Sequence, residues 1–378
     1  MRNANAPFDV EIVSLSDMSG ADVQRWNAWA APGGELVSPY FRIEFAQAVA
    51  AARRDARFAV IRREGEIIGY FPHHAPRGGV IRPIGAPMSD YQGVIARSGV
   101  DIPPAQILRA CRGSALVYDN WSATLGGRPV PRRGREGSVI MDLAEGGQAY
   151  LDERRGLFRD HFKKTERRRR SAEAEHGEAH VEIGDADGEA FDTLMAWKQA
   201  QYEQTGKFNV LGVNWVRRVL DDLRSREDGL RGVTASLWFG GKIAAVEFGL
   251  CADGVYHSWF PAYHPAYAKF SPGLLLLHGI VEQAESLGVK RIDLGRGGQH
   301  YKKYYASYEA PLDHGRALAP GFASAAIQGW EAAEAAASVL PGKLSELPAR
   351  ARRRWSQVSA FEPRLGPRLA AMAGAIAS

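Results

Sequence analysis

The chain has 378 residues and a formal net charge of +5, with 45% hydrophobic and 24% charged residues. This length exceeds what one ordinary core organises, and the composition is that of a folded globular chain. No run of 18 apolar residues occurs, so we expect no membrane-spanning helix. The charge is uneven, since residues 151–176 carry +3 and residues 341–378 carry +5. A nucleic-acid-binding protein spreads basic residues over a folded face, so nucleic acid is not expected as a partner.

The first part of the chain alternates strand and helix patterns. A strand is predicted in "DVEIVSL" (9–15) and a helix follows near 22–29. The stretch "RFAVIRREGEIIGYFPHHA" (57–75) predicts two strands joined at Glu64-Gly65, a hairpin signal. Two more short strands are expected in "SDYQGVIA" (89–96) and "GSALVYDNW" (113–121), separated by a helix. We therefore predict a mixed α/β domain over residues 1–149.

A basic segment follows, "FRDHFKKTERRRRSAEAEHG" (158–177). It has few apolar residues, and its acids precede bases at a spacing of four, as in Asp160 with Lys164 and Glu166 with Arg170. Each such pair stabilises an exposed helix by roughly 0.2–0.5 kcal/mol. The pattern predicts a mostly solvated linker helix over 150–177 that ends near Gly177. The run Arg167–Arg170 within it is expected to be dispensable for binding a donor substrate. Steering of an anionic substrate and binding of RNA stay open as roles.

The second domain is expected over 178–318. Helices are predicted near 187–205 and 213–226, and three strands follow in residues 232–262, with turns at Gly240-Gly241 and Asp253-Gly254. A helix opens at Ser271-Pro272, closes at Gly288 and leads into another strand. Both domains thus share one order of elements. We predict a tandem α/β (α+β) fold with central mixed, mainly antiparallel sheets.

The tail, residues 319–378, is rich in alanine and interrupted by prolines. One helix and shorter helical pieces are expected there, and removal of residues 341–378 is expected to leave a folded protein. Cys111 and Cys251 lie in apolar stretches without ligand-like spacing, which is typical of core residues in a reducing compartment. The ten histidines show no metal-binding pattern, so no metal is expected.

The helix start at Ser271 is one candidate for function. Unpaired N–H groups at a helix N-terminus bind phosphate, and the preceding loop brings Tyr263, Tyr267 and Lys269 to it. The alternative is an ordinary buried helix with a capped start, because Leu274–Leu277 would be buried in either case.

Acyl transfer needs a base, and two side chains are candidates. Glu247 interrupts the apolar strand "IAAVEFGL", where burial would raise the pKa of its carboxyl group. His257 lies on the adjacent predicted strand. Either can be structural instead, Glu247 paired with an arginine and His257 as a core histidine. Asp293, at a strand end, is expected to cap the glycines after it or to orient Arg296.

The series "FSPGLLLLHGIVEQAESLGVKRIDLGRGGQHYKKYYAS" (270–307) resembles the acetyltransferase family of the Gcn5-related superfamily that is associated with bacterial cellulose and exopolysaccharide biosynthesis. The matching residues are Tyr267, Ser271–Leu274, Asp293, Gly295–Gly297 and Tyr301-Lys302. "SPYF" (38–41), "SDYQG" (89–93) and the basic segment are also similar to it. The resemblance covers about residues 10–315, and Fem-type aminoacyl transferases are related.

The resemblance implies an acyl-CoA site in the C-terminal copy, in a cleft where two neighbouring strands separate. The residues it places at the donor are Ser258, Phe260, Tyr263, Tyr267, Lys269, Ser271, Pro272, Gly273 and Leu274. The candidate catalytic residues, chosen for their residue types and positions, are Glu247, His257 and Asp293. Those that the resemblance implies at the acceptor are Asp90, Tyr91, Arg296, Tyr301 and Lys302. The superfamily's common phosphate loop, Gln/Arg-x-x-Gly-x-Gly/Ala, is absent, which leaves the donor open.

The expected function is acyl-CoA-dependent transfer to a sugar, sugar nucleotide or amino compound in polysaccharide or envelope biosynthesis. The alternatives are a Fem-type transferase that uses aminoacyl-tRNA and a non-catalytic scaffold of a polysaccharide-synthesis complex. A cytoplasmic location is expected, with peripheral association with envelope-synthesis machinery at the inner membrane as a further expectation.

Overall fold

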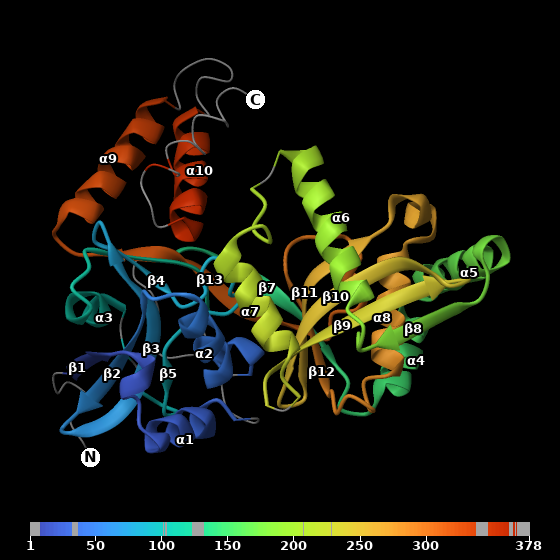
Figure 1. Ribbon diagram of the computed structural model, residues 1–378, viewed down its shortest axis with the longest axis horizontal. Coiled ribbons are helices and arrows are strands. Elements are labelled where there is room, and N and C mark those ends of the chain that lie inside the picture. Colours follow the sequence, from blue (N-terminus) through green and yellow to red (C-terminus); the bar gives the residue numbers. More distant parts are fainter. Residues whose placement is uncertain are drawn as a thin grey trace. The chain divides into compact units, whose positions relative to one another are not determined.

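Figure 1 shows the computed structural model of the chain, which describes residues 8–31, 37–100, 102, 104–122, 132–206, 208–227, 229–337, 347–362, 366 and 368. The chain folds into two compact units made of interleaved segments. Unit 1 consists of Met1–Asp22, Arg53–Arg135 and Asp313–Ser378, and unit 2 of Val23–Ala52 and Glu136–Leu312. Both units are mixed α/β, as expected, but their segments are not consecutive, because residues 23–52 belong with unit 2 and the tail with unit 1.

Unit 1 is built on an antiparallel meander followed by a helix and a parallel strand. Its elements are β1 (Phe8–Val13), η1 (Leu15–Asp17), β2 (Ala56–Arg63), β3 (Glu66–Arg77), β4 (Val80–Pro83), β5 (Ile95–Ala96), α3 (Pro104–Ala110) and β6 (Ala115–Ser122). The strand order is β1-β2-β3-β4-β6, and β6 runs parallel to β4. The turn at Glu64-Gly65 is confirmed, with φ of 53° and 81°.

Unit 2 repeats this arrangement. Its elements include β8 (Ala179–Ile183), β9 (Arg231–Phe239), β10 (Lys242–Ala252), β11 (Val255–Tyr263), η3 (Pro265–Phe270), α8 (Pro272–Glu282), β12 (Arg291–Arg296) and η4 (Lys302–Tyr304). From β8 to β11 each strand is antiparallel to the next, and β12 is parallel to β11. The predicted tandem fold is therefore confirmed. Two strands, β7 (Arg132–Asp142) and β13 (Tyr308–Leu318), have residues in both units.

Unit 2 contains further helices. They are α1 (Gly20–Trp29, whose first residues belong to unit 1), η2 (Pro39–Phe41), α2 (Ile43–Ala52), α6 (Glu189–Thr205) and α7 (Asn214–Arg224). Helix α7 buries five apolar residues on one face, and α2 packs against it. Helix α2 was not predicted from the sequence, and its residues 43, 45, 46, 48, 49 and 52 are all buried. An apolar helix of this kind lacks the one-sided periodicity on which helix prediction depends.

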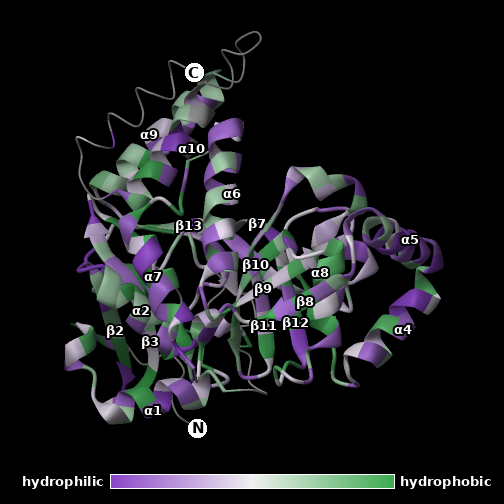
Figure 2. Ribbon diagram, turned by 45° about the vertical axis from the view of Figure 1, so that its right-hand side comes forward, coloured by the Kyte–Doolittle hydropathy of each residue, from purple (hydrophilic) through white to green (hydrophobic). Residues whose placement is uncertain are grey.

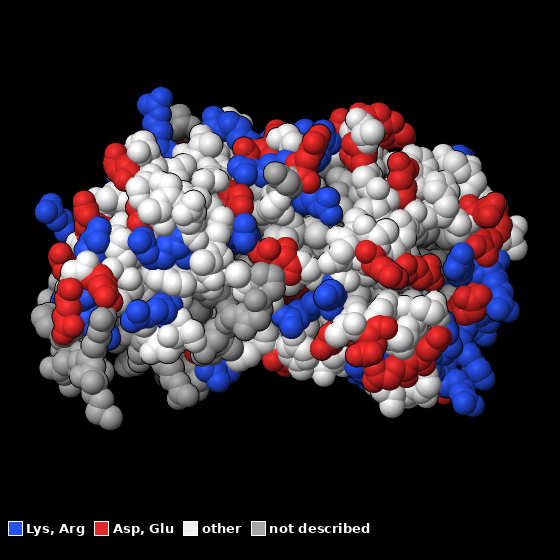
Figure 3. Space-filling model, turned by 90° about the horizontal axis from the view of Figure 1, so that it is seen from below, with Lys and Arg blue, Asp and Glu red and all other residues white. Residues whose placement is uncertain are grey.

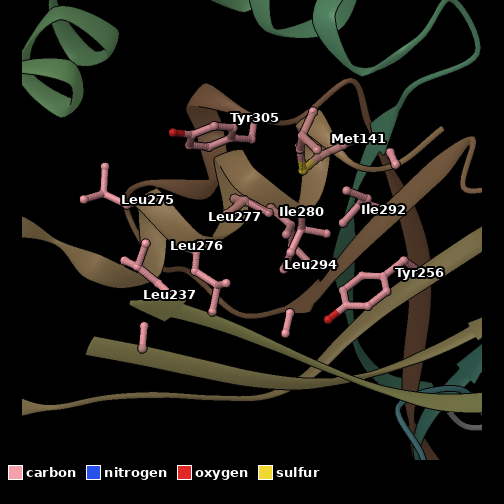
Figure 4. Packing of buried hydrophobic residues seen from close by; sticks show 14 of the residues in the cluster. Met141, Leu237, Tyr256, Leu275, Leu276, Leu277, Ile280, Ile292, Leu294 and Tyr305 are labelled. Atoms are coloured by element: carbon pink, nitrogen blue, oxygen red, sulfur yellow. The ribbon is translucent and has the colours of Figure 1, made fainter. Parts of the chain in front are cut away.

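Helix α8 lies over one face of the sheet and forms the centre of the core of unit 2. Figure 4 shows Leu275, Leu276, Leu277 and Ile280 packed among residues such as Tyr256 and Leu294 from the neighbouring strands. Each buried side chain of this size stabilises the fold by about 1.5–3 kcal/mol. The start of α8 is therefore held in place by the packing of its own leucines.

The predicted linker helix is two helices, α4 (Gly147–Leu157) and α5 (Arg159–His176), that meet at Phe158. Helix α5 is hydrophilic over most of its length, whereas α8 is hydrophobic (Figure 2). Nevertheless α5 buries Phe162, Thr165 and Ala172. Its C-terminal end is held by an ion pair of 2.7 Å between Lys269 and Glu175. It ends before Gly177, as predicted, but it is a packed element of unit 2 rather than a solvated linker.

The tail contains α9 (Phe322–Ala337) and α10 (Leu347–Phe361). Val358, Ala360 and Phe361 of α10 are buried, and Arg53 donates a hydrogen bond of 3.1 Å to the carbonyl of Ala360. Helix α10 is thus packed within unit 1, and the expectation that removal of residues 341–378 leaves a folded protein stays a prediction. None of the described helices has the length and apolarity needed to cross a membrane.

Candidate functional site

A cleft opens in unit 2 where two parallel strands separate. Strands β11 and β12 are paired from Val255 with Arg291 to His257 with Asp293, and the pairing ends there. Beyond this point β11 continues to Tyr263 without its neighbour, so backbone groups on that edge are free to pair with a ligand. The cleft has a volume of about 1250 Å³ and is lined by residues of β10, β11, α5, α6, α8 and the segment after β12.

Glu247 is a buried acidic side chain that lines the cleft. It lies on β10, is 7% exposed and accepts a hydrogen bond of 3.0 Å from the hydroxyl of Tyr256. Burial raises the pKa of its carboxyl group, and hydrogen bonds from Ser258 and Tyr256 lower it in part. The structure thus brings Glu247 to the cleft, as expected, in an environment that keeps its pKa above the ordinary 4.5.

Tyr301 supplies a hydroxyl group to the same cleft. Burial, and secondly the carboxylate of Glu247, raise the pKa of Tyr301 to about 12. The phenol therefore stays protonated at neutral pH and can donate a proton or a hydrogen bond. Together Glu247 and Tyr301 provide a proton acceptor and a proton donor in one cleft, the pairing that general acid–base catalysis needs.

The N-terminus of α8 forms another wall. Ser271 precedes it in the left-handed conformation, and Ser271, Pro272, Gly273 and Leu274 all line the cleft, as predicted. Pro272 has no N–H group, and the N–H groups of Leu274 and Leu275 donate to the carbonyl of Ser271. The amide of Gly273 is therefore the first-turn donor left for a ligand. A Cβ atom on Gly273 would meet no atom within 4 Å, so a ligand can approach the backbone closely.

Helix α5 contributes His161, whose ring is held by a chain of hydrogen bonds. The ring of His161 stacks on Tyr304 at 4.0 Å, and both line the cleft. Its Nε2 lies 3.2 Å from the hydroxyl of Tyr305, which lies 2.7 Å from Nε2 of His278. Burial lowers the pKa of His278 to about 4, so this ring is neutral at neutral pH. The chain fixes the orientation of His161 at the cleft wall.

His257 and Asp293, expected as catalytic, do not line the cleft. His257 is fully buried, with Nδ1 3.4 Å from the carboxylate of Asp293 and its ring edge-on to Tyr40. Asp293 also accepts hydrogen bonds from Ser138 (2.6 Å) and the amide of Gly295 (2.8 Å). Successive residues of a strand face opposite sides. His257 therefore points away from Ser258 and the cleft, and the pair ties β11, β12 and β7 together.

Three residues expected at the donor also lie elsewhere. Tyr267 is buried against Phe239, Phe260 is buried, and Lys269 pairs with Glu175. Ser258 and Tyr263 do line the cleft.

Of the residues expected at the acceptor, only Tyr301 is brought to the cleft. Lys302 is buried, and its Nζ donates to the carbonyls of Gly295 and Arg296, at 2.9 Å each. It thus stabilises the chain reversal after β12 rather than facing a ligand. Arg296 lies 3.9 Å from Glu136 and does not line the cleft. Asp90 and Tyr91 belong to unit 1.

Several cleft residues were not predicted from the sequence. They are Arg159, Asp160, His161, Lys164 and Arg168 on α5, Lys198 and Gln201 on α6, and Gln299, His300 and Tyr304 after β12. The residues of α5 carried a signal, because His161, Lys164 and Arg168 recur at spacings of three and four and so share a helix face. No group of His, Cys, Asp and Glu in the described ranges is arranged to hold a metal ion.

One family model and several solved structures are similar to this chain. Residues 159–303 match the model of the family described as acetyltransferase (GNAT) domain. FemX shares 12% identity at a TM-score of 0.50, over 80% of this chain and 96% of FemX. A tandem GNAT protein from the clavulanic acid biosynthesis pathway shares 12% identity (TM-score 0.43, 83% of this chain and 100% of that chain). A GCN5-related N-acetyltransferase from Kribbella flavida also shares 12% (TM-score 0.39, 74% and 95%).

At these identities the likeness to FemX shows the fold alone. No curated protein matches the chain. The family match runs from the start of α5 to η4 and so contains nearly all residues that line the cleft. Residues 159–303 are therefore similar to a GNAT-type acetyltransferase domain.

Proposed function

We propose that this protein is an acyltransferase that moves an acyl group from an acyl-CoA, such as acetyl-CoA, to an amine or hydroxyl group of a second substrate. The observation that supports this most directly is the separation of β11 and β12 beyond His257 and Asp293, with Glu247 lining the resulting cleft. The volume of about 1250 Å³ exceeds the roughly 300–1,000 Å³ of ordinary single-ligand pockets. It therefore has room for a donor and an acceptor together.

The donor fits the features of the cleft wall. The free edge of β11 from Ser258 to Tyr263 offers amide and carbonyl groups to the two amides of the pantetheine arm. The amide of Gly273 and the positive end of α8 suit a phosphate group.

The chain's own residues then supply the proton transfers. Glu247, as a carboxylate, accepts the proton that the acceptor amine or hydroxyl loses as it forms its bond to the acyl carbon. Tyr301 donates a proton to the sulfur atom as the bond between sulfur and the acyl carbon breaks. The raised pKa of each group suits its role, since it makes Glu247 a better base and keeps Tyr301 protonated. No net proton is gained or lost once Glu247 returns its proton to Tyr301 through solvent.

The acceptor we propose is a sugar, a sugar nucleotide or an amino compound in polysaccharide or envelope biosynthesis. The sequence resemblance of residues 270–307 supports this class. The likeness of fold to FemX keeps a Fem-type transfer from aminoacyl-tRNA as the second candidate. The two candidate functions use different donors, so the experiment must identify which donor supplies the transferred group.

The test is native mass spectrometry of the gently purified protein, followed by transfer assays with radiolabelled acyl-CoA and, separately, labelled aminoacyl-tRNA. We expect retained coenzyme A and label transferred from acyl-CoA to an amino sugar or sugar nucleotide. Transfer from aminoacyl-tRNA alone would establish the second candidate. Absence of transfer from either donor, with co-purification of a polysaccharide synthase, would favour a non-catalytic scaffold.

A further inference from the structure

The basic residues of α5 lie on different faces of the helix. Lys164 and Arg168 line the cleft together with His161, whereas Lys163, Arg167, Arg169 and Arg170 do not. The side chains of residues four apart lie over one another on a helix, so Lys164 and Arg168 act at the same place. Lys and Arg side chains gather at the right of Figure 3, where α5 lies in Figure 1. The cleft thus receives two of the six cations between Lys163 and Arg170. Arg159 and Asp160, at the start of α5, also line it, and the expected ion pair between Asp160 and Lys164 does not form.

Charge pairing differs along the helix. Arg169 pairs with Glu173 at 3.1 Å and Arg170 with Glu166 at 3.0 Å. Within the part of the chain that the structure describes, no carboxylate lies within ion-pair distance of Lys164 or Arg168. Arg168 is moreover half-buried. Two cations that face a cleft without a partner attract an anion into it, because the protein walls screen charges less than water does.

Other groups show that these charges converge on the cleft. Burial is the largest cause of the lowered pKa of His161, and the positive charges of Arg168, His300 and Lys164 lower this pKa further. The N-terminus of α8, by contrast, offers a partial charge and the single amide of Gly273. A doubly charged phosphate therefore needs a stronger partner than this helix start alone.

We propose that Lys164 and Arg168 form an anion subsite of the cleft, which binds a phosphate or diphosphate group of a substrate. Arginine offers a planar pair of N–H donors that matches two phosphate oxygens, and lysine adds a point charge. This subsite rests on the proposed function in that the phosphate belongs either to the acyl-CoA donor or to a phosphorylated acceptor such as a sugar nucleotide.

The helix supplies a matched control for the test. Lys163 and Arg167 have the same residue types and spacing, lie one position earlier, also lack an ion pair among the described residues and do not line the cleft. We therefore compare Lys164→Gln/Arg168→Gln with Lys163→Gln/Arg167→Gln in the full chain. Glutamine is a good helix former, and both variants lose two positive charges.

Calorimetric titration with inorganic pyrophosphate at low salt is the first measurement. We expect the 164/168 variant to bind about tenfold or more weakly than wild type, as for lost hydrogen bonds to a charged group. The 163/167 variant is expected to stay within about threefold, because its charges are separated from the cleft by screening solvent. Equal losses in the two variants, no loss in either, or no binding by the wild type would overturn the subsite.

A second measurement on the wild type avoids any doubt about folding of the variants. Pyrophosphate should slow the reaction of Lys164 with an amine-directed reagent and leave the adjacent Lys163 unchanged, as read by peptide mass spectrometry. Equal protection of the two lysines, or protection of neither, would contradict the proposal.

The source of the phosphate follows from titrating acetyl-CoA and UDP-N-acetylglucosamine against the same two variants. A loss confined to the 164/168 variant with acetyl-CoA assigns the group to the donor, and one with the sugar nucleotide assigns it to the acceptor. If the 164/168 variant bound both acetyl-CoA and UDP-N-acetylglucosamine as tightly as the wild type does, a role of the subsite in substrate binding would be overturned. Failure of acyl transfer with every acyl-CoA would count against the proposed function but not against the subsite, since neither pyrophosphate binding nor lysine protection requires turnover.

Discussion

Units 1 and 2 repeat one order of strands, but they differ in the gap beside their parallel pair. In unit 2, β11 and β12 part after His257 and a cleft opens. In unit 1, β4 ends at Pro83, and Gln92 then takes its place beside Trp121 of β6 as a parallel bridge. The backbone N–H group of Gln92 donates to the backbone carbonyl of Asn120, at 2.8 Å. The backbone carbonyl of Gln92 accepts from the backbone N–H group of Ser122, also at 2.8 Å. The chain itself thus pairs with the edge that a ligand would use.

The length of the connection explains this difference. Residues 84–103 separate β4 from α3, whereas residues 264–271 separate β11 from α8. The longer connection is able to fold back along β6, and the Gln92 side chain secures it by accepting from the amide of Asp119 at 3.1 Å. The shorter one leads directly into a long helix. One topology therefore yields a filled gap in unit 1 and an open one in unit 2, which supports unit 2 as the catalytic copy.

The largest expected effect is on turnover. Glu247→Gln keeps the shape of the side chain and an acceptor for Tyr256 but removes the base, so we expect kcat to fall by roughly 10²–10⁴-fold. Donor affinity should stay near that of the wild type. Steady-state kinetics and calorimetry with acetyl-CoA separate the two quantities. Glu182→Gln, on the exposed face of β8, is the control for loss of a carboxylate in the same unit. Full turnover in Glu247→Gln would show that the base is another group or a water molecule.

The pH dependence of kcat/KM sharpens the same assignment. Glu247 works as a carboxylate, so the rate should fall about tenfold per pH unit below its pKa. Burial raises that pKa, so the acid limb should lie above 4.5. Tyr256→Phe removes a hydrogen bond that lowers the pKa and should move the limb to higher pH. Tyr301, with a pKa of about 12, should cause no basic limb near neutral pH. An acid limb that persists unchanged in Glu247→Gln would exclude Glu247 as its origin.

Donor binding at α8 gives the next largest effect. Gly273→Asp places a carboxylate where a phosphate is expected, and two like charges about 4 Å apart repel by ~4 kcal/mol at an effective dielectric of 20. We expect acetyl-CoA to bind at least about tenfold more weakly. Gly273→Ala should bind normally, since a Cβ atom there meets nothing within 4 Å. Gly20→Asp is the control, because it places a carboxylate at the start of another helix, α1, whose residues do not line the cleft. Normal binding by Gly273→Asp would place the donor elsewhere.

The features that were predicted correctly from the sequence are those fixed by neighbouring residues. Glu64-Gly65, Gly240-Gly241 and Asp253-Gly254 all have positive φ, the conformation that two-residue hairpins require. Ser271-Pro272 starts a helix because proline suits its first position. Glu247 stood out as the single acid in an apolar strand. Each signal lies within a few residues of the structure it predicts.

The errors concern side chains whose direction depends on distant partners. Lys302 turns inward because the carbonyls of Gly295 and Arg296 need donors, and His257 faces Asp293 across two strands. Residue type alone gives no sign of either. The basic segment was expected to be mostly solvated, whereas one of its faces is buried or lines the cleft. The expected role of Asp90 and Tyr91 at the acceptor stays a prediction, whereas the anchoring of their stretch to β6 by Gln92 was not foreseen.

This last difference leads to the prediction with the smallest expected effect on donor binding. Gln92→Ala removes the side chain that accepts from the amide of Asp119 and lies 3.3 Å from the carbonyl of Ser89. Because that amide loses its partner in a buried region, we expect the free energy of unfolding to fall by about 1–3 kcal/mol. The backbone bonds of Gln92 to Asn120 and Ser122 remain, so the gap in unit 1 should stay filled. Acetyl-CoA affinity and stoichiometry should therefore not change. Chemical denaturation measures the free energy of unfolding, and calorimetry measures the affinity and stoichiometry of acetyl-CoA binding.

If a second equivalent of acetyl-CoA bound to Gln92→Ala, residues 89–93 would be covering a latent donor site in unit 1. If binding were lost instead, unit 1 would take part in the donor site, and the division of roles between the two units would be wrong.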